Sequence, residues 1–362
     1  MVLGGSRAAP ACRPGPGQMT ARSDQRPTLD QVAALAGVGR GTASRVINGS
    51  VHVSERSRRA VEAAVAELQY IPNAAARALK TRRTDAVALV IAESEDRIFG
   101  EPFFAGVVRG ISKSLSEVGK QLVLLVYQAG VRSSHLESYL SRQHVDGVLL
   151  LSLHDDDRLP EVIRSRALPM VVGGRGRQVA DTSWVDFDNV NGAGLAAQLL
   201  VDIGCQTIGA ITGPLDMAAG RDRYDGFRAA LQAAGRSLPD DLVAHGDFSQ
   251  PSGTRAMVEL IERRPDVDGV FCANDPMAAA ALQVIRDSGR RIPDDVAVIG
   301  YDDAPLALGT HPPLTTVRQQ PEEMGHAMVE LLLAQFHDSG SQPDTRVLET
   351  SLVERGSTRA RP

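Results

Sequence analysis

Short apolar runs alternate with helical patterns from Asp85 onward, and this rhythm constrains the fold of most of the 362-residue chain. The first run is Ala86-Val-Ala-Leu-Val-Ile-Ala, and similar runs begin at Gln121 and Gly147, with a helical pattern over 103–118 between the first two. Strands that are apolar along their whole length are buried on both faces, as in parallel sheets covered by helices. The pattern therefore predicts a doubly wound α/β lobe.

The same rhythm restarts after Asp186, which predicts a second doubly wound sheet. A last helix is expected over 321–336, followed by one closing strand over 346–353. In open α/β sheets, ligands bind outside the carboxyl ends of the strands, and two facing lobes enclose them from both sides. Residues that directly follow the strands are therefore the candidates for a binding site.

Three polar residues take such positions. Asn274 and Asp302 follow predicted strands, and Arg223 lies at the start of a helix after another strand. Their amide, carboxylate and guanidinium groups offer paired donors and acceptors that fit vicinal hydroxyls. We therefore expect a sugar-like ligand between the lobes.

Residues 28–49 have the pattern of a helix-turn-helix. Thr28 is a candidate N-cap with Gln31 three residues later, and the first helix is expected to end at Gly37. The second helix is expected over 40–48, and small and basic residues lie on its outer face, namely Arg40, Gly41, Ser44 and Arg45. Such a face suits a helix in the DNA major groove, although an ordinary helical hairpin would have a similar pattern.

A third helix is expected after Ser54, which completes a compact helical headpiece. The segment that follows, Tyr70-Ile-Pro-Asn-Ala-Ala-Ala-Arg-Ala-Leu-Lys, is basic and rich in alanine. It has too little apolar surface to fold alone, so we expect it to order on contact with a partner. Residues 1–26 contain scattered proline, glycine and arginine without periodicity and are expected to be disordered.

Charge is unevenly distributed along the chain. Residues 1–84 contain 13 Lys or Arg and 5 Asp or Glu, a balance of +8, while the remainder contains 26 and 39, a balance of −13. A basic head joined to an acidic body is typical of a nucleic-acid-binding module attached to another domain.

Together these segments resemble the lactose-repressor (LacI/GalR) family of transcriptional regulators. The resemblance covers residues 28 to about 356 and is carried by motifs that occur in the family's order. They are Val32-Ala, Leu35-Ala-Gly-Val, Thr42-Ala-Ser-Arg-Val-Ile-Asn-Gly, Tyr70-Ile-Pro-Asn-Ala-Ala-Ala-Arg-Ala-Leu, Gly213-Pro-Leu, Arg221-Asp-Arg-Tyr-Asp-Gly-Phe, Ala273-Asn-Asp-Pro-Met-Ala, Ile292-Pro-Asp-Asp-Val-Ala-Val-Ile-Gly-Tyr-Asp-Asp and Pro312-Pro-Leu-Thr-Thr-Val-Arg-Gln.

The resemblance implies an all-α helix-turn-helix headpiece and an α/β two-lobed body like that of periplasmic binding proteins, with two doubly wound parallel sheets. The chain is expected to cross between the lobes three times. The expected boundaries are a tail at 1–26, a headpiece at 27–71, a hinge and linker at 72–84, a body at 85–356 that binds effector and dimerises, and a tail at 357–362.

The resemblance also implies that a homodimer binds palindromic double-stranded operator DNA. The DNA-contacting residues it implies are Thr28, Arg40, Gly41, Thr42, Ser44, Arg45 and Asn48 in the headpiece, and Asn73, Ala76, Leu79 and Lys80 in the hinge. Leu79 takes the position of the apolar side chain that wedges between base steps in the minor groove. The alternative for Leu79 is a buried contact within the linker.

For the effector, the resemblance implies a mono- or oligosaccharide between the lobes. The site residues are Phe103, Phe104, Phe187, Arg223, Phe248, Asn274, Asp302 and Gln319, and for each phenylalanine core packing is the alternative. Two departures from the family pattern stand out. Gly174 occupies a position where many members have an acidic residue, so Arg175 is expected to face the cleft instead, and Gly39 and Gly41 replace a polar cap and a base reader.

The function expected from this reading is a dimeric repressor whose operator affinity is controlled by a sugar. An effector-activated regulator is the first alternative, and a sugar-binding protein without a DNA function is the second. The sequence contains no P-loop, dinucleotide fingerprint or nucleophile elbow, and His154-Asp-Asp-Asp has no partner histidine at metal-binding spacing, so we expect neither an enzyme nor a metal or other cofactor. Without a membrane-length apolar run or a signal peptide, the expected location is cytoplasmic.

Overall fold

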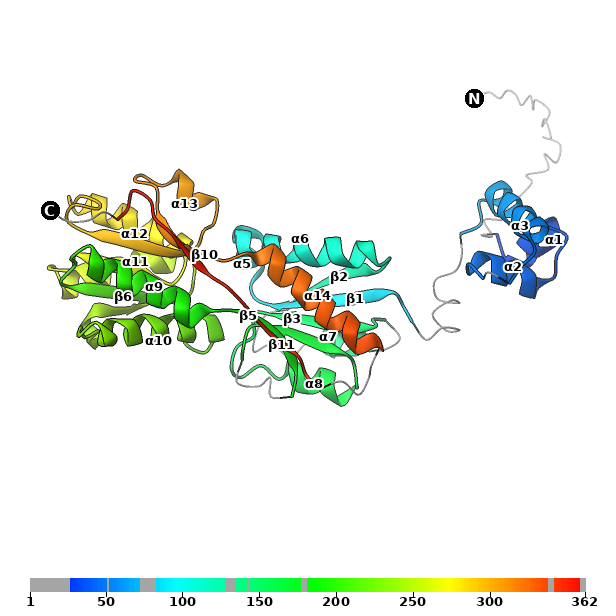
Figure 1. The fold of residues 1–362 in the computed structure, drawn as a ribbon, viewed down its shortest axis with the longest axis horizontal. Coiled ribbons are helices and arrows are strands. Elements are labelled where there is room, and N and C mark those ends of the chain that lie inside the picture. The colour runs from blue at the N-terminus through cyan, green and yellow to red at the C-terminus, as the bar shows by residue number, and fades with distance from the viewer. Residues whose placement is uncertain are drawn as a thin grey trace, which may run out of the picture. The chain divides into compact units, whose positions relative to one another are not determined.

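A computed structural model of the protein describes residues 27–50, 52–71, 83–127, 134–141, 144–176, 181–337 and 342–358. The chain separates into two compact units, with the boundary between Ala74 and Ala75 (Figure 1). We call residues 27–71 the headpiece and residues 83–358 the body. The predicted hinge at 72–80 and the N-terminal tail lie outside the described residues.

The headpiece is the predicted three-helix unit, with α1 at Leu29–Leu35, α2 at Arg40–Ile47 and α3 at Glu55–Leu68. Thr28 caps α1: the Gln31 amide donates to the Thr28 hydroxyl at 3.3 Å, and the Gln31 side chain accepts from the Thr28 amide at 2.8 Å. Its small core consists of Val32, Ala33, Ala43, Val46, Val61 and Ala64.

Lobe 1 of the body contains a six-stranded sheet with the order β11-β5-β4-β3-β1-β2. Its strands are β1 (Ala86–Ala92), β2 (Gln121–Tyr127), β3 (Gly147–Leu151), β4 (Met170–Gly173), β5 (Ser183–Phe187) and β11 (Thr345–Leu348). Its helices are α5 (Glu95–Gly100), α6 (Pro102–Glu117), α7 (Ser134–Tyr139), α8 (Leu159–Ser165) and α14 (Pro321–His337). Every residue of β1 is buried, because alternate side chains enter two different apolar clusters on opposite faces of the sheet.

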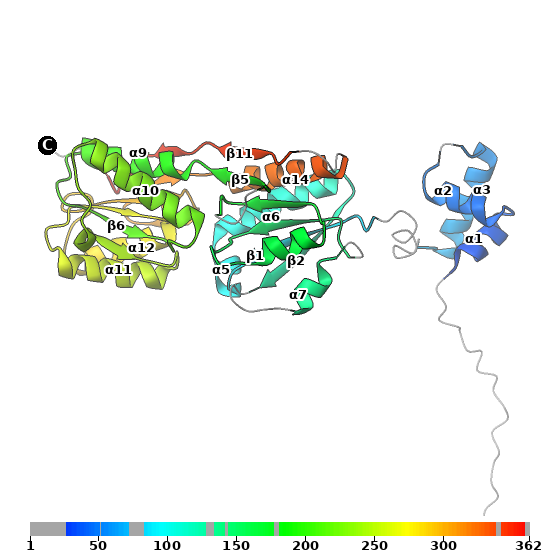
Figure 2. The ribbon, with the colours of Figure 1, turned by 90° about the horizontal axis from the view of Figure 1, so that it is seen from below.

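Lobe 2 repeats this topology with the order β12-β10-β9-β8-β6-β7. Its strands are β6 (Ile208–Thr212), β7 (Val243–His245), β8 (Gly269–Cys272), β9 (Ala297–Asp302), β10 (Thr315–Arg318) and β12 (Ser351–Val353). Its helices are α9 (Asn189–Asp202), α10 (Ala218–Ala233), the 3-10 turn η1 (Asp240–Leu242), α11 (Gln250–Arg263), α12 (Asp275–Asp287) and α13 (Leu306–Gly309). Figure 2 shows α9 and α10 on one face of this sheet and α11 and α12 on the other.

The chain crosses between the lobes three times, after β5, after β10 and after β11, as predicted. The single closing strand predicted at 346–353 is wrong, because this segment is divided between the two sheets. β11 pairs parallel with β5 in lobe 1, and β12 pairs antiparallel with β10 in lobe 2 (Figure 1). One continuous segment therefore supplies an edge strand to each sheet. Among the described strand pairs, β10 with β12 is antiparallel and the others are parallel.

In each lobe, two helices pack against each other closely at a glycine. A Cβ at Gly110 in α6 would lie 2.1 Å from the carbonyl oxygen of Glu322 in α14, and a Cβ at Gly226 in α10 would lie 2.3 Å from that of Val190 in α9. No real side-chain carbon fits at such distances, so glycine lets the two backbones touch. Among the described residues, no helix is long and apolar enough to span a membrane.

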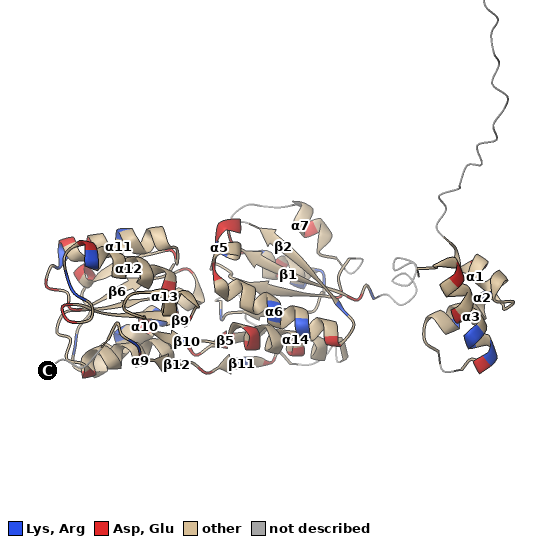
Figure 3. Ribbon diagram, turned by 90° about the horizontal axis from the view of Figure 1, so that it is seen from above, with Lys and Arg blue, Asp and Glu red and all other residues tan. Residues whose placement is uncertain are grey.

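Few charged residues lie in the described strands, and Figure 3 shows them mainly on helices and loops. Asp302 and Arg318 are the last residues of β9 and β10, and Asp186 is the penultimate residue of β5. These three charged side chains therefore lie at or next to the carboxyl ends of strands, the place where an open α/β sheet binds its ligands.

Candidate functional site

A pocket of about 80 Å³ lies between the two lobes of the body. Most lining residues follow strands or begin helices. Lobe 1 contributes Phe103, Leu151, Ser152, Leu153, Val172, Gly173, Gly174, Gly176, Asp186, Phe187 and Met324, and lobe 2 contributes Asn189, Met217, Ala218, Ala219, Arg223 and Gln319. Four predicted effector residues, Phe103, Phe187, Arg223 and Gln319, are among them.

Three residues that follow or end strands in the body have positive φ angles, and one of them, Ser152, lines the pocket. Ser152 after β3, Phe248 after β7 and Asp302 at the end of β9 have φ values of 63°, 70° and 112°. Residues other than glycine rarely adopt such angles, and they persist where the surrounding structure holds them.

Arg223 is the centre of a buried polar network in lobe 2. Its Nε donates to Asn189 Oδ1 at 2.9 Å, and one terminal nitrogen donates to the Ala273 carbonyl at 2.6 Å. The guanidinium also lies 3.4 Å from Asp302 Oδ1 and from Gln319 Oε1, and its Cζ is 3.8 Å from the Tyr301 ring centroid. Because lobe 2 itself supplies every one of these partners, the guanidinium is fixed independently of lobe 1.

Asp302 joins this network from the end of β9. It accepts from Gln319 Nε2 at 2.5 Å, and burial raises the pKa of its carboxyl to about 7, against the opposing effect of Arg223. The structure therefore brings together three predicted residues, Arg223, Asp302 and Gln319, in one group of donors and acceptors beside the pocket.

Asp186 was missed by the sequence analysis. Its carboxylate accepts from the Arg175 amide at 2.9 Å, the Phe187 amide at 2.8 Å and Asn189 Nδ2 at 3.0 Å, and burial raises its pKa to about 6. A signal was present, because Asp186 is an acidic residue at the carboxyl end of an otherwise uncharged strand. The rule that selected Asp302 also selects Asp186.

The predicted aromatic walls divide into two groups. Phe103 and Phe187 line the pocket. Phe104 is a core residue of lobe 1 in edge contact with Phe103, at 5.5 Å between ring centroids, so the core-packing alternative describes it. Phe248 is also buried, but its ring lies between the guanidinium groups of Arg97 at 5.3 Å and Arg223 at 5.8 Å.

Asn274 does not line the pocket. Its Oδ1 accepts from the Met277 amide at 3.0 Å and caps α12, while its Nδ2 donates to the Phe248 carbonyl at 2.7 Å. Both polar groups of the side chain are used within lobe 2. Its role in this structure is to hold the Phe248 loop in place.

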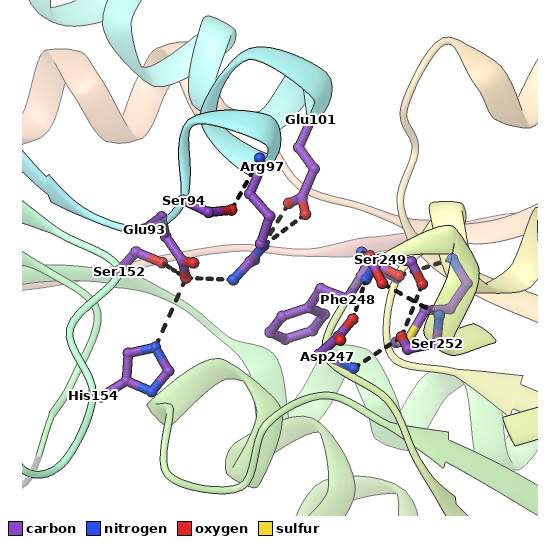
Figure 4. Close-up of polar contacts among 12 residues, drawn as sticks. Glu93, Ser94, Arg97, Glu101, Ser152, His154, Asp247, Phe248, Ser249 and Ser252 are labelled. Carbon is purple, nitrogen blue, oxygen red and sulfur yellow. Dashed lines mark hydrogen bonds and ion pairs between the residues drawn. The ribbon is translucent and has the colours of Figure 1, made fainter. Parts of the chain in front are cut away.

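A second charged cluster lies in lobe 1 and consists of Glu93, Arg97 and Glu101, with Ser152 beside it (Figure 4). Arg97 pairs with Glu93 and donates to Glu101 Oε1 at 2.8 Å, and the Ser152 hydroxyl donates to Glu93 at 2.8 Å. The three charged side chains are only 8 to 16% exposed. The regular four-residue spacing directly after the apolar strand β1 could have revealed this cluster from sequence.

Several polar contacts cross from one lobe to the other. His154 Nδ1 lies 2.8 Å from Asp216, Arg221 lies 3.1 Å from Asp155, and Arg175 lies 2.9 Å from Asp222. Arg175, which was expected to face the cleft, does not line the pocket and pairs with Asp222 of lobe 2. His154 and Asp155, which the sequence analysis considered as part of a metal cluster, contribute to interlobe contacts instead.

In the headpiece, α2 carries the predicted basic face. Arg40, Gly41, Arg45 and Asn48 are exposed, and Thr42 and Ser44 are partly exposed. Arg40 pairs with Asp30 at 3.4 Å, but both side chains are more than 60% exposed, so the pair is weak and leaves Arg40 available. Thr28 is engaged in its capping box, and the predicted hinge contacts Asn73, Ala76, Leu79 and Lys80 lie outside the described residues.

Comparisons with known proteins agree with this architecture. The family model for bacterial regulatory proteins of the lacI family matches residues 28–73, and the model for the periplasmic binding protein-like domain matches residues 197–358. The HTH-type transcriptional regulator CelR of Thermobifida fusca is 52% identical over 92% of this chain and 98% of its own length. The ribose operon repressor of Escherichia coli K12 is 36% identical over 91% and 99%.

Two solved structures extend the comparison. A complex of the transcriptional regulator CelR with cellobiose has 50% sequence identity and a TM-score of 0.74, covering 92% of this chain and all of its own. The lac repressor dimer bound to operator and an anti-inducer has 29% identity and a TM-score of 0.81, with 92% and 99% coverage. The chain belongs to the lacI family of bacterial regulatory proteins.

Proposed function

We propose that this protein is a dimeric transcriptional repressor whose affinity for a palindromic operator is lowered by cellobiose or a closely related glucose oligosaccharide. The observation that carries the proposal is the group of Arg223, Asp302 and Gln319 beside an interlobe pocket walled by Phe103 and Phe187. Hydrogen-bonding groups that match vicinal hydroxyls, together with aromatic faces, suit a pyranose ring. The relative that has been solved with cellobiose supports the choice of sugar.

Operator recognition is assigned to α2 of the headpiece. Arg40 and Arg45 are the exposed basic residues of this helix, and arginine can bind guanine through two hydrogen bonds in the major groove. Gly41, Thr42, Ser44 and Asn48 surround them and can contact bases or phosphates. The minor-groove wedge proposed for Leu79 stays a prediction that the described residues do not reach.

Dimerisation is assigned to lobe 1. A groove along α5, α6 and β2 is lined by apolar side chains that include Phe99, Val108 and Leu124, and Phe99 is 75% exposed. Contiguous exposed apolar surface of this kind marks an interaction site. A second copy of the chain is the proposed occupant, because the two headpieces of a dimer match the two halves of a palindrome.

Control by the sugar follows from linkage. The contacts between the lobes, such as His154 with Asp216 and Arg97 with Phe248, depend on how far the lobes are closed. A ligand that binds the closed and open forms of the body with different free energies shifts the affinity for DNA by at most that difference. Such a coupling free energy is typically about 1–3 kcal/mol.

The proposal is tested by fluorescence anisotropy of the full-length protein on DNA from upstream of its own gene, with and without cellobiose. We expect tight, salt-sensitive binding that cellobiose weakens by about 5- to 150-fold. Arg45→Ala should weaken specific binding by about 1–3 kcal/mol. Arg59→Ala, an exposed arginine on α3, is the matched control.

The outcomes separate the parts of the proposal. If cellobiose tightened DNA binding, the sugar would act as a co-repressor and not as an inducer. Equal operator affinity for Arg45→Ala and the parent would remove α2 from base recognition. Absence of specific DNA binding under every condition would contradict the regulator itself.

A further inference from the structure

The Glu93–Arg97–Glu101 cluster lies on the lobe 1 side of the cleft and faces lobe 2. Figure 4 shows the Arg97 guanidinium between the carboxylates of Glu93 and Glu101, with the Phe248 ring nearby. Its Cζ lies 5.3 Å from the Phe248 ring centroid, and Phe248 belongs to lobe 2. Ser152 connects the cluster to the pocket, because it lines the pocket and donates to Glu93. The cluster is therefore continuous with the proposed sugar site.

The cluster contains two carboxylates for one guanidinium, and that guanidinium is fully engaged. Arg97 donates through Nε at 2.8 Å and through a terminal nitrogen at 3.4 Å to Glu101, and its other terminal nitrogen donates to Glu93. A ligand phosphate or carboxylate could reach Arg97 only by displacing one of these carboxylates. His154 Nε2 also lies 3.9 Å from Glu93, but its Nδ1 lies 2.8 Å from the Asp216 carboxylate, so this side chain too already has anionic partners. The cluster and its neighbours thus contain more carboxylates than cations.

The arginines on the lobe 2 side are engaged in the same way. Arg223 is directed at Asn189, Ala273, Asp302 and Gln319. Arg221 pairs with Asp155 from the other lobe. Neither guanidinium is left to balance an incoming anion without losing a partner that it already has.

The carboxylates also act on one another across the cleft. Burial is the largest influence that raises the pKa of Asp302, and Glu101 of lobe 1 raises it further. Burial likewise raises the pKa of Glu101, with Glu93 adding to the effect. An anion between these carboxyls would either be repelled by their ionised forms or require their protonation, because like charges at low dielectric repel strongly.

We propose that the Glu93–Arg97–Glu101 cluster selects neutral polyhydroxy ligands and excludes their phosphorylated or carboxylated counterparts. Sugar hydroxyls can donate to the carboxylates of Glu93 and Glu101, whereas an anionic sugar meets repulsion. The nearby guanidinium groups already have partners, including Arg175, which pairs with Asp222. Discrimination by a repulsive element of this kind is a general route to specificity. The inference rests on the proposed function, since it concerns the ligand of the same cleft.

The test is isothermal titration calorimetry of the full-length protein with matched neutral and anionic sugars. The pairs are cellobiose with cellobiose 6′-phosphate, cellobiose with cellobionate, and glucose with glucose 6-phosphate. We expect the neutral member of a pair that binds to bind at least about 10-fold more tightly than its anionic partner. Cellobiose 6′-phosphate has its charge on the non-reducing glucose unit, and cellobionate has its charge at the reducing end. The two pairs together therefore test the cluster whichever end of the sugar lies beside it.

Three variants assign the preference to the cluster. Glu93→Gln and Glu101→Gln keep the side-chain shape and remove one charge, so the neutral-to-anionic affinity ratio should fall at least about fivefold in each. Glu95→Gln makes the same chemical change at an exposed position of α5 and should leave the ratio unchanged. A variant that is only structurally damaged loses affinity for both sugars and keeps the ratio.

Equal binding of neutral and anionic sugars by the parent overturns the inference and leaves the sugar-controlled repressor standing. A ratio that stays the same in both Glu93→Gln and Glu101→Gln also overturns it. Binding of none of the neutral sugars contradicts the proposed effector class, and the inference then fails with it.

Discussion

The two lobes have the same strand order but present their polar groups differently. In lobe 2, Arg223 is anchored by its own lobe, through Asn189, a backbone carbonyl, Asp302 and Gln319. In lobe 1, Arg97 is anchored by Glu93 and Glu101, and its face rests on Phe248 of the opposite lobe. The polar partners of each arginine therefore come from its own lobe, but Arg97 also makes a contact with Phe248 that exists only when the lobes are closed.

Removal of Arg223 is the strongest test of the lobe 2 side. In Arg223→Ala, Asp302, Gln319 and the Ala273 carbonyl lose a buried charged donor, a change that typically costs about 3–5 kcal/mol. We expect cellobiose affinity to fall more than 100-fold in calorimetry, while the operator is still bound and no longer released. Arg228→Ala, an exposed arginine on the same helix, is the control. A normal sugar response in Arg223→Ala would remove this residue from the site.

Asp186 provides a pH test of the lobe 1 side. Because its folded pKa is raised from 3.8 to about 6, ionisation is harder in the folded state, and the free energy of unfolding should fall as pH rises between these values. The total loss is ~3 kcal/mol, from about two pKa units at 1.36 kcal/mol each. In Asp186→Asn this loss is absent.

The measurement is urea unfolding of parent and variant from pH 4 to pH 7.5. The stability of Asp186→Asn relative to the parent should rise by ~2.5 kcal/mol across this range, because a small part of the total is already lost at pH 4. Any constant cost of losing a hydrogen-bond acceptor cancels in that comparison. A stability difference that does not change with pH would show that Asp186 has the same pKa in the folded and unfolded states.

The helix pairs offer a test of whether the lobes are equally rigid. Gly110→Ala and Gly226→Ala would each force a methyl group against a helix backbone, and we expect each to destabilise its lobe by about 1–3 kcal/mol. Gly194→Ala in α9 meets only the Ala230 side chain at 3.7 Å, so it should be neutral or stabilise by up to ~1 kcal/mol. Thermal unfolding compares the three variants. If Gly110→Ala did not change the stability and Gly226→Ala lowered it, the α6–α14 packing of lobe 1 would be the more adaptable of the two helix pairs.

The smallest effect is expected for the contacts that join the lobes. Arg221 and Asp155 are partly buried, at 18 and 24% exposed, and a pair of this kind contributes at most about 1 kcal/mol. A double-mutant cycle with Arg221→Ala and Asp155→Ala, read out as cellobiose affinity, should give a coupling of up to about fivefold. Zero coupling would mean that this pair does not help to set the closure of the lobes.

Much of the fold could be predicted because its signals are local. Apolar runs such as Ala86–Ala92 define buried strands whatever their neighbours, and Thr28 with Gln31 forms the capping box that their spacing indicates. The closing segment was predicted incorrectly because nothing local marks Glu349 and Thr350 as the point where the chain changes lobes. That division is set by pairing with β5 in one sheet and β10 in the other, which are distant in sequence.

The position of a site residue could be predicted where it lies at the end of a strand, as for Asp302 and Phe187, or in the helix that follows a strand, as for Arg223. The contacts of a side chain were harder to predict where it could reach either the pocket or the interior of its own lobe. Asn274 follows a strand as expected, but its groups bond to the next helix and to the Phe248 loop. Phe104 differs from Phe103 only by one step around a helix, which turns its ring from the pocket into the core.

The split of the closing segment has a consequence for how the protein is made. The headpiece is continuous in sequence, whereas lobe 1 waits for α14 and β11, and lobe 2 waits for β12 at Ser351–Val353. Synthesis on the ribosome proceeds from the N-terminus, and domains fold as units once their residues have emerged. The DNA-binding unit is therefore complete hundreds of residues before either lobe, during which time the edges of β5 and β10 await their last strands. A prematurely terminated translation product would carry a finished headpiece without the means to respond to a sugar.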